Sequence, residues 1–208
     1  MKVIGITGGV GAGKSEVLSY IKSKYNCRII LADDVGNQVK LPGESCYNSL
    51  CKLLGDSVLD ENGYIIKEKM AAMIFPDKEL LEKVNAIIHP AVEAYILAEI
   101  EKEKKRKQYD FFFVEAALLI ECGYGTHLDE MWYVFARKEV RKARLMSARQ
   151  YSEEKIKSIM NGQLSEDEFR KHCKVVIDNS DDFEVTKQQI DKILGDELWK
   201  IQKNTRDN

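Results

Sequence analysis

Residues 8–15 read GGVGAGKS, the G-x-x-x-x-G-K-S spacing of a loop that binds the phosphates of a nucleotide. Glycine lets the backbone approach a polyphosphate closely and adopt φ values that other residues resist, so that successive N–H groups point at phosphate oxygens. In this pattern the Lys14 ammonium reaches the β- and γ-phosphates, and the Ser15 hydroxyl is a ligand of Mg²⁺. A glycine-rich turn without a ligand is the alternative. The apolar run before the loop and the amphipathic stretch after it favour a nucleoside triphosphate site.

Two carboxylates, Asp33 and Asp34, follow directly after the second apolar run. In an open α/β sheet, ligands bind outside the carboxyl ends of the strands. A carboxylate there can orient or deprotonate an attacking hydroxyl, which is the main polar task left in phosphoryl transfer once the phosphates are held. Carboxylates at a helix start can instead cap the helix. We expect Asp33 to be the catalytic base, and Asp34 to cap the helix or face solvent.

A third carboxylate, Glu115, ends the apolar run FFFVE at 111–115. Such a run is typical of the strand that delivers one acid to the metal side of a phosphate loop. Glutamate is one methylene longer than aspartate, so it can reach a metal-bound water or a substrate hydroxyl instead of the metal itself. Glu121, a few residues later, either closes the substrate pocket or ends a helix.

Five apolar runs predict strands, and segments with helical periodicity separate them: the runs are 2–7, 28–31, 109–115, 131–136 and 174–177. Strands that alternate with helices predict an α/β fold with a central five-stranded parallel sheet flanked by helices. The long interval between the second and third strands reads mostly as helices. We therefore expect an inserted helical subdomain there, with Pro90 opening its longest helix.

Composition and charge restrict the class of protein. The chain has 208 residues, of which 44% are apolar, and this supplies an ample core for one α/β domain with an insertion. Its 32 basic and 34 acidic residues argue against a general nucleic-acid-coating role. The five cysteines form no C-x-x-C pair, which favours reduced thiols over disulfides or a zinc site. No membrane-length apolar run and no signal-peptide pattern is present, so we expect a cytoplasmic enzyme.

These residues resemble one family closely, the dephospho-coenzyme A kinases, over nearly the whole chain. The phosphate loop alone would indicate only a superfamily, but an ordered set of further matches accompanies it: LAD at 31–33, Asn85 with HP at 89–90, LL at 118–119, Arg144, Gln163 and IDNS at 177–180. The resemblance implies the P-loop NTPase fold. It also implies ATP-dependent phosphorylation of the ribose 3′-hydroxyl of dephospho-coenzyme A, with ATP and Mg²⁺ as cofactors. Leu31 and Glu115 depart from the family, which usually has aspartate at both positions.

The resemblance further implies a role for individual residues. Catalysis is assigned to Asp33, Lys14 and Arg144, and the metal to Ser15. The residues implied to bind ATP are Gly9, Val10, Gly11, Ala12, Gly13, Lys14, Ser15, Arg144, Arg170 and Asn179. Those expected at the acceptor substrate are Asp33, His89, Glu115 and Leu118.

Four arginines lie in the segment 137–149, which resembles the start of the family's mobile lid: Arg137, Arg141, Arg144 and Arg149. An arginine that closes over transferring phosphates supplies permanently charged donors, and lid closure excludes water. Arg144 is the best candidate for this role, while surface ion pairs are the alternative for Arg137 and Arg141. We expect one P-loop kinase domain, with a core at about 1–32, 109–136 and 171–208, an acceptor-binding helical insertion at about 33–108 and a lid at about 137–170.

Two other functions are weighed against this interpretation. Another small P-loop kinase, acting on a nucleoside monophosphate or a metabolite, shares the core and lid but is disfavoured by the helical insertion. A nucleotide-controlled switch is disfavoured because the guanine-reading N-K-x-D motif is absent. We expect a small-molecule partner, no nucleic acid, no membrane, and a monomer or weak homo-oligomer.

Overall fold

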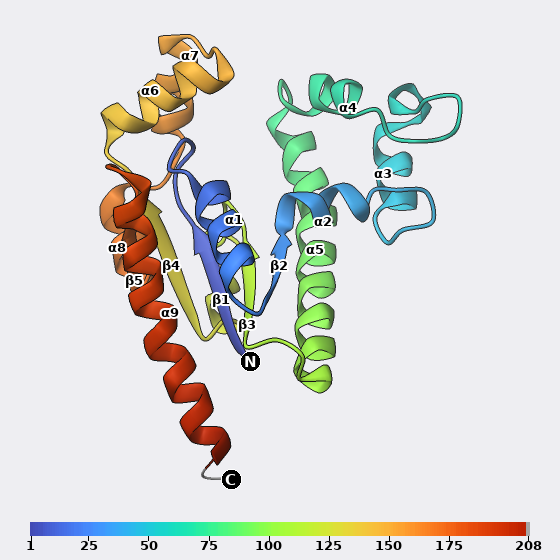
Figure 1. Cartoon of the computed structure of the whole chain (residues 1–208). Coiled ribbons are helices and arrows are strands. Elements are labelled where there is room, and N and C mark those ends of the chain that lie inside the picture. The colour runs from blue at the N-terminus through green and yellow to red at the C-terminus, as the bar shows by residue number, and fades with distance from the viewer. Residues whose placement is uncertain (207–208) are drawn as a thin grey trace. The chain divides into compact units, whose positions relative to one another are not determined.

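The computed structural model describes the backbone of residues 1–206 and the side chains of residues 1–199 and 201. A five-stranded parallel sheet lies at its centre, with the strand order β2-β3-β1-β4-β5 (Figure 1). The strands are β1 (Lys2–Thr7), β2 (Cys27–Leu31), β3 (Phe111–Glu115), β4 (Glu130–Phe135) and β5 (Val175–Asp178). The predicted fold class is confirmed, and each observed strand lies within two residues of the predicted run.

The central strands are apolar along most of their length because both faces of the sheet are covered. Phe111, Phe112 and Phe113 are all fully buried, although consecutive residues of a strand point to opposite faces. On one face, Phe113 and Trp132 pack against the helices α1 (Lys14–Lys24) and α9 (Phe183–Arg206). This core fixes the strand and helix on either side of the phosphate loop.

The opposite face of the sheet is covered near β4 by α8 (Glu166–His172). Tyr133 stacks on Phe169 with ring centroids 4.6 Å apart, and Cys173 packs beside them. Two further helices, α6 (Lys138–Arg149) and α7 (Glu153–Asn161), stand beyond the carboxyl end of β4 (Figure 1). Ser152 caps α7 by accepting a hydrogen bond from the Lys155 N–H.

The chain divides into two compact units. We call Met1–Ile29 with Glu103–Asn208 the sheet unit, and Ile30–Lys102 the helical unit. The sheet unit also contains the short 3₁₀ helix η2 (Tyr124–Thr126). The helical unit holds α2 (Ala32–Gln38), α3 (Tyr47–Leu54), η1 (Asp56–Val58), α4 (Lys67–Ile74) and most of α5 (Lys78–Arg106).

The expected helix start at Pro90 is wrong. α5 begins at Lys78 and runs through Pro90 without a break to Arg106. Asp77 accepts a hydrogen bond from the Leu80 N–H at 3.0 Å and so caps the true start of the helix. Buried residues on either side of the proline, Val84 and Val92 among them, hold the helix together even though proline cannot donate its own backbone hydrogen bond.

Candidate active site

The phosphate loop connects β1 to α1. Gly8, Gly11 and Gly13 have φ angles of 148°, 81° and 92°, a region that residues with a side chain rarely adopt. Gly13 is also the N-cap residue of α1 and brings no side chain to it. The positive end of the α1 dipole therefore lies at the loop, which is the arrangement that binds anions at helix N-termini.

Lys14 and Glu115 meet beside this loop. The Lys14 Nζ donates to the Gly8 carbonyl at 2.9 Å and lies 3.5 Å from Glu115 Oε1. Both side chains are mostly buried, with 14% and 16% of their surface exposed. Glu115 reaches this place because it ends β3, whose register sets it opposite Ile6 of β1. Ser15 follows Lys14 in the first turn of α1 and is exposed.

Two arginines of α6 contact the loop. Arg144 Nη1 lies 3.3 Å from the Ala12 carbonyl and 3.5 Å from that of Gly11. Arg141 Nε donates to the Val10 carbonyl at 2.8 Å, so the surface ion pair weighed for Arg141 from the sequence is not its main contact. Arg137 does form a surface ion pair, but with Asp181 at 2.5 Å and not with the expected Glu139 of α6.

The contacts of Arg141 and Gln163 with the loop backbone were not assigned from the sequence, which left open which of Arg141, Arg144 and Arg149 closes on the phosphates. Gln163 Oε1 accepts from the Val10 N–H and from Arg141 Nη2. The helical spacing of the arginines does not distinguish Arg141, which contacts the loop, from Arg137, which forms a surface ion pair. Gln163 matched the family pattern, and that match was the only available pointer. By contrast, Arg149 lies exposed at the end of α6, 6.0 Å from the Tyr151 ring.

The Asn179 side chain forms a buried hydrogen bond with the backbone of the loop. Its side chain is fully buried, donates to the Ala12 carbonyl at 2.9 Å and accepts from the Thr186 hydroxyl at 2.9 Å. A Cβ atom on Gly13 would collide with the Asn179 amide, so this glycine is required by space as well as by its φ angle.

The other residues predicted in the sheet unit lie further from these contacts. Leu118 follows β3 and is 49% exposed. Arg170 pairs with Glu166 of its own helix at 2.7 Å, and its guanidinium lies 5.3 Å from the centre of the Phe135 ring.

In the helical unit, Asp33 and Asp34 are exposed and both lie in the first turn of α2. The N-cap residue is Leu31, and no side chain caps the helix. Of the two alternatives for Asp34, capping is therefore wrong and exposure to solvent is observed. His89 is half-buried in α5.

Lys40 is a further ionisable group of the helical unit that the sequence did not single out. Burial lowers the pKa of its ammonium, the charge of Lys67 adds to that effect, and the charge of Asp33 opposes it.

The donors beside the loop suit Mg²⁺. Within the described part of the chain, no three His, Cys, Asp or Glu side chains come together as a metal site. Mg²⁺ does not need one, since it is usually bound by one or two protein oxygens together with substrate phosphates and water. The exposed Ser15 hydroxyl and the Glu115 carboxylate are oxygen donors of this kind.

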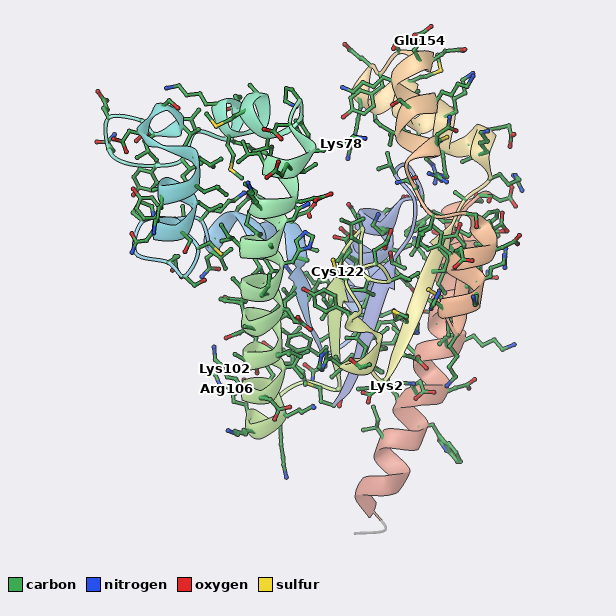
Figure 2. All side chains as sticks on the ribbon, turned by 180° about the vertical axis from the view of Figure 1, so that it is seen from behind. Lys2, Lys78, Lys102, Arg106, Cys122 and Glu154 are labelled. Carbon is green, nitrogen blue, oxygen red and sulfur yellow. The ribbon has the colours of Figure 1, made fainter. Side chains whose placement is uncertain are left out.

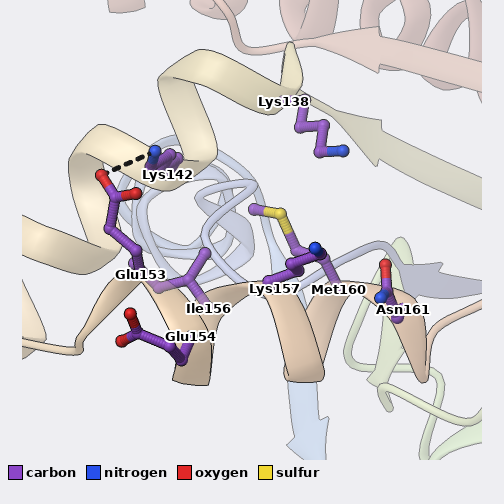
Figure 3. Close-up of a pocket in the computed structure, with 8 residues that line it drawn as sticks. All are labelled: Lys138, Lys142, Glu153, Glu154, Ile156, Lys157, Met160 and Asn161. Atoms are coloured by element: carbon purple, nitrogen blue, oxygen red, sulfur yellow. Dashed lines mark ion pairs between the residues drawn. The ribbon is translucent and has the colours of Figure 1, made fainter.

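A hollow of about 420 Å³ lies between α6 and α7 (Figure 3). Lys138, Lys142 and Lys157 line it together with Glu153 and Glu154, and Lys142 pairs with Glu153 at 2.9 Å. None of the predicted site residues lines this hollow.

Comparison with known proteins gives the family. The dephospho-CoA kinase family profile matches residues 2–184. A dephospho-CoA kinase from Carboxydothermus hydrogenoformans is 33% identical over 200 residues, which cover 96% of each chain. The chain belongs to the dephospho-CoA kinase family. It is accordingly a transferase that phosphorylates dephospho-CoA with ATP in coenzyme A biosynthesis, and the predicted family and enzyme class are confirmed.

Solved structures support the fold of this dephospho-CoA kinase. TT1252 from Thermus thermophilus superposes with a TM-score of 0.76 at 26% identity, covering 94% of this chain and 97% of its own. A dephospho-CoA kinase from Campylobacter jejuni gives a TM-score of 0.71 at 22% identity, covering 94% and 96%. None of the helices in the described residues is long and apolar enough to cross a membrane.

Proposed function

We propose that this kinase transfers the γ-phosphoryl group of ATP to the ribose 3′-hydroxyl of dephospho-coenzyme A, giving coenzyme A and ADP, through the residues named above. The observation that carries the proposal is the phosphate loop with Lys14 and Glu115 beside it, in a chain of this family. Transfer of a phosphoryl group requires little covalent chemistry from the protein, so catalysis lies in positioning and in stabilising negative charge.

The binding of ATP is assigned to the loop and its neighbours. Backbone N–H groups of the loop from Gly9 to Ser15 hold the phosphates, except that of Val10, which donates to Gln163. Lys14 stabilises the charge that develops on the phosphates during transfer. Arg144, which lies against the loop carbonyls, adds a second permanent positive charge. Arg170 and Asn179 complete the proposed ATP-binding set, Asn179 through its support of the loop.

The acceptor is assigned to four residues, Asp33, His89, Glu115 and Leu118. Asp33 serves as the base that takes the proton from the ribose hydroxyl, in keeping with its exposed position directly after β2. His89, Glu115 and Leu118 contact the acceptor. In this proposal the helical insertion at about 33–108 binds dephospho-coenzyme A, and the segment at about 137–170 is the lid that excludes water.

Mg²⁺ is the metal that we propose, with Ser15 as its protein ligand and Glu115 as a second oxygen beside it. When bound, it neutralises charge on the β- and γ-phosphate oxygens. Glu115 also holds the Lys14 ammonium near the loop, at 3.5 Å, so its carboxylate contributes to the geometry of the site in either case.

The test is the release of ADP from ATP and Mg²⁺ by the purified protein, with and without dephospho-coenzyme A. We expect release to depend on the acceptor and the product to gain the mass of one phosphate. Nucleoside monophosphates serve as competing acceptors. Saturation by one of them instead would favour the other small-molecule kinase, and acceptor-independent hydrolysis alone would favour the nucleotide switch.

Three further properties stay predictions of this proposal. They are action in the cytoplasm, a monomer or weak homo-oligomer, and the lack of a nucleic-acid or membrane partner. Analytical ultracentrifugation of the purified chain measures the oligomeric state directly.

A further inference from the structure

One residue of the phosphate loop is bonded through both of its backbone groups to side chains outside the loop. The Val10 carbonyl accepts from Arg141 Nε at 2.8 Å, and the Val10 N–H donates to Gln163 Oε1 at 3.3 Å. Arg141 Nη2 donates to that same Gln163 oxygen at 2.5 Å. The three residues therefore close a ring of hydrogen bonds around one loop residue, with Arg141 coming from α6 and Gln163 from the turn after α7.

The loop leaves space for the Arg141 guanidinium at Gly9. A Cβ atom on Gly9 would collide with three atoms of the Arg141 guanidinium. Unlike Gly8, Gly11 and Gly13, this glycine does not have a positive φ angle. Its lack of a side chain thus serves close approach, and the group that approaches is Arg141.

The guanidinium of Arg141 forms hydrogen bonds only with uncharged groups. Its hydrogen-bond acceptors among the described residues are a backbone carbonyl and a carboxamide, and no carboxylate of those residues forms an ion pair with it. Burial lowers the pKa of this guanidinium, although an arginine stays charged at neutral pH. Arg137 on the same helix segment is different, because Asp181 neutralises it. A half-buried cation without an acid, placed against a phosphate loop, favours the arrival of a polyanion.

We propose that Arg141 raises the affinity of the loop for the nucleotide polyphosphate, and that Gln163 is the positioning residue that fixes its guanidinium against Val10. We call Arg141, Gln163 and the Val10 backbone the Val10 clamp. That the nucleotide is ATP rests on the proposed function. The clamp itself is a property of the loop and does not require the acceptor substrate, dephospho-coenzyme A. Gln163 acts through Arg141, because one carboxamide oxygen serves both the guanidinium and the loop N–H.

The test is calorimetric titration of the protein with β,γ-imido-ATP and Mg²⁺, without acceptor. Arg141→Met removes a charged donor with two hydrogen bonds, and we expect roughly tenfold weaker binding. Gln163→Met is expected to weaken binding about threefold, on the scale of one neutral hydrogen bond. The double variant is expected to bind no more weakly than Arg141→Met, since the second change acts through the first. In the kinase assay, we expect each of these variants to have a higher KM for ATP than the wild type, with kcat at saturating ATP close to the wild-type value.

Gln163→Glu gives a second, conservative test. It keeps an acceptor for Arg141 but adds negative charge beside the Val10 N–H. We expect weaker binding of β,γ-imido-ATP in a protein whose thermal melting, measured without nucleotide, is unchanged.

Lys142→Met is the matched control. Lys142 joins the same two helices, α6 and α7, through its ion pair with Glu153 (Figure 3). Its binding of β,γ-imido-ATP should equal that of the wild type.

Three results would overturn the clamp. They are wild-type affinity in Arg141→Met, an equal loss of affinity in Lys142→Met, and a double variant whose loss of affinity is the sum of the single losses. The proposed function and the clamp can fail separately. If the wild-type protein does not phosphorylate dephospho-coenzyme A but Arg141→Met still binds β,γ-imido-ATP more weakly, the proposed function is wrong and the clamp stands.

Discussion

At the scale of single residues, the loop is held by side chains that contact its carbonyls and so leave its concave side for phosphates. Arg144, Arg141 and Asn179 all donate to carbonyls between Val10 and Ala12. Lys14 instead reaches back to the Gly8 carbonyl and lies next to Glu115. These contacts hold the lysine side chain beside the loop, which reduces the ordering needed on binding.

The two residues with the most specific proposed chemistry are Lys14 and Asp33. Lys14→Ala removes the charge that stabilises the transferring phosphoryl group, and Asp33→Asn removes the base, so each should lower kcat by roughly 10²-fold or more. The measurement is steady-state ADP release at saturating ATP and dephospho-coenzyme A. Asp34→Asn, a change of the same kind one residue away, is the control and should retain wild-type turnover. Turnover near wild type in Asp33→Asn would contradict its role as the base.

Asn179 is expected to affect stability as well as the loop. Asn179→Ala leaves the Ala12 carbonyl and the Thr186 hydroxyl without a buried partner, which should lower the free energy of unfolding by about 1–3 kcal/mol. Urea denaturation followed by tryptophan fluorescence measures this loss. Asn161→Ala, at an exposed asparagine of α7, is the control and should change stability by less than about 0.5 kcal/mol. Equal stability of the two variants would show that the Asn179 hydrogen bonds contribute nothing net.

At the scale of elements, an ion-pair network around the buried carboxylate of Glu130 connects the amino ends of the strands. Glu130 at the start of β4 accepts from the Trp132 indole at 2.8 Å and lies 3.1 Å from Lys2 and 3.3 Å from Lys174. Figure 2 shows Lys2 at the end of the sheet opposite to the helix that carries Glu154. This network therefore fastens β1 and β4 far from the phosphate loop.

The network predicts a dependence of stability on pH. Burial alone would raise the pKa of Glu130, but the Trp132 hydrogen bond and the Lys2 and Lys174 ammonium groups outweigh it, and the pKa lies below its usual range. A carboxyl whose pKa is lowered by folding contributes stability above its unfolded pKa, and this contribution is lost as the pH falls through the folded pKa. Glu130→Gln should therefore be less stable than wild type at neutral pH, and the difference should shrink below about pH 4. Urea midpoints across this range measure it, with the exposed Glu121→Gln as control; a constant difference would contradict the linkage.

The sequence predicted some elements well and others poorly for identifiable reasons. Strands buried on both faces are continuous apolar runs, and the phosphate loop is a fixed local pattern, so both could be located from the chain alone. Residues 75–77 were correctly expected to open a helix, which Asp77 caps. The second helix start expected at Pro90 was wrong. Proline favours the first turn of a helix, but here buried side chains on both sides of Pro90 keep the helix continuous. The Arg141 contact was missed because it depends on tertiary structure, which brings residues 10, 141 and 163 together.

At the scale of the whole molecule, the chain passes between its two units inside regular elements. The boundary at Ile29 and Ile30 falls within β2, and the boundary at Lys102 and Glu103 falls within α5. The residues proposed for ATP lie in the sheet unit, whereas Asp33 and His89 lie in the helical unit. The two substrates should therefore leave separable signatures on the chain.

Hydrogen–deuterium exchange can detect these signatures. β,γ-imido-ATP with Mg²⁺ should slow amide exchange in the phosphate loop, the first turn of α1 and α6, because ligand binding stabilises the segments it contacts. Dephospho-coenzyme A alone should slow exchange in α2 and around His89 in α5. Lys14→Ala is the control that separates the two effects, since it should abolish the protection by nucleotide and preserve the protection by the acceptor. Protection of the helical unit alone by the nucleotide would contradict the assignment of ATP to the loop, and loss of both effects in Lys14→Ala would contradict the assignment of the acceptor to the helical unit.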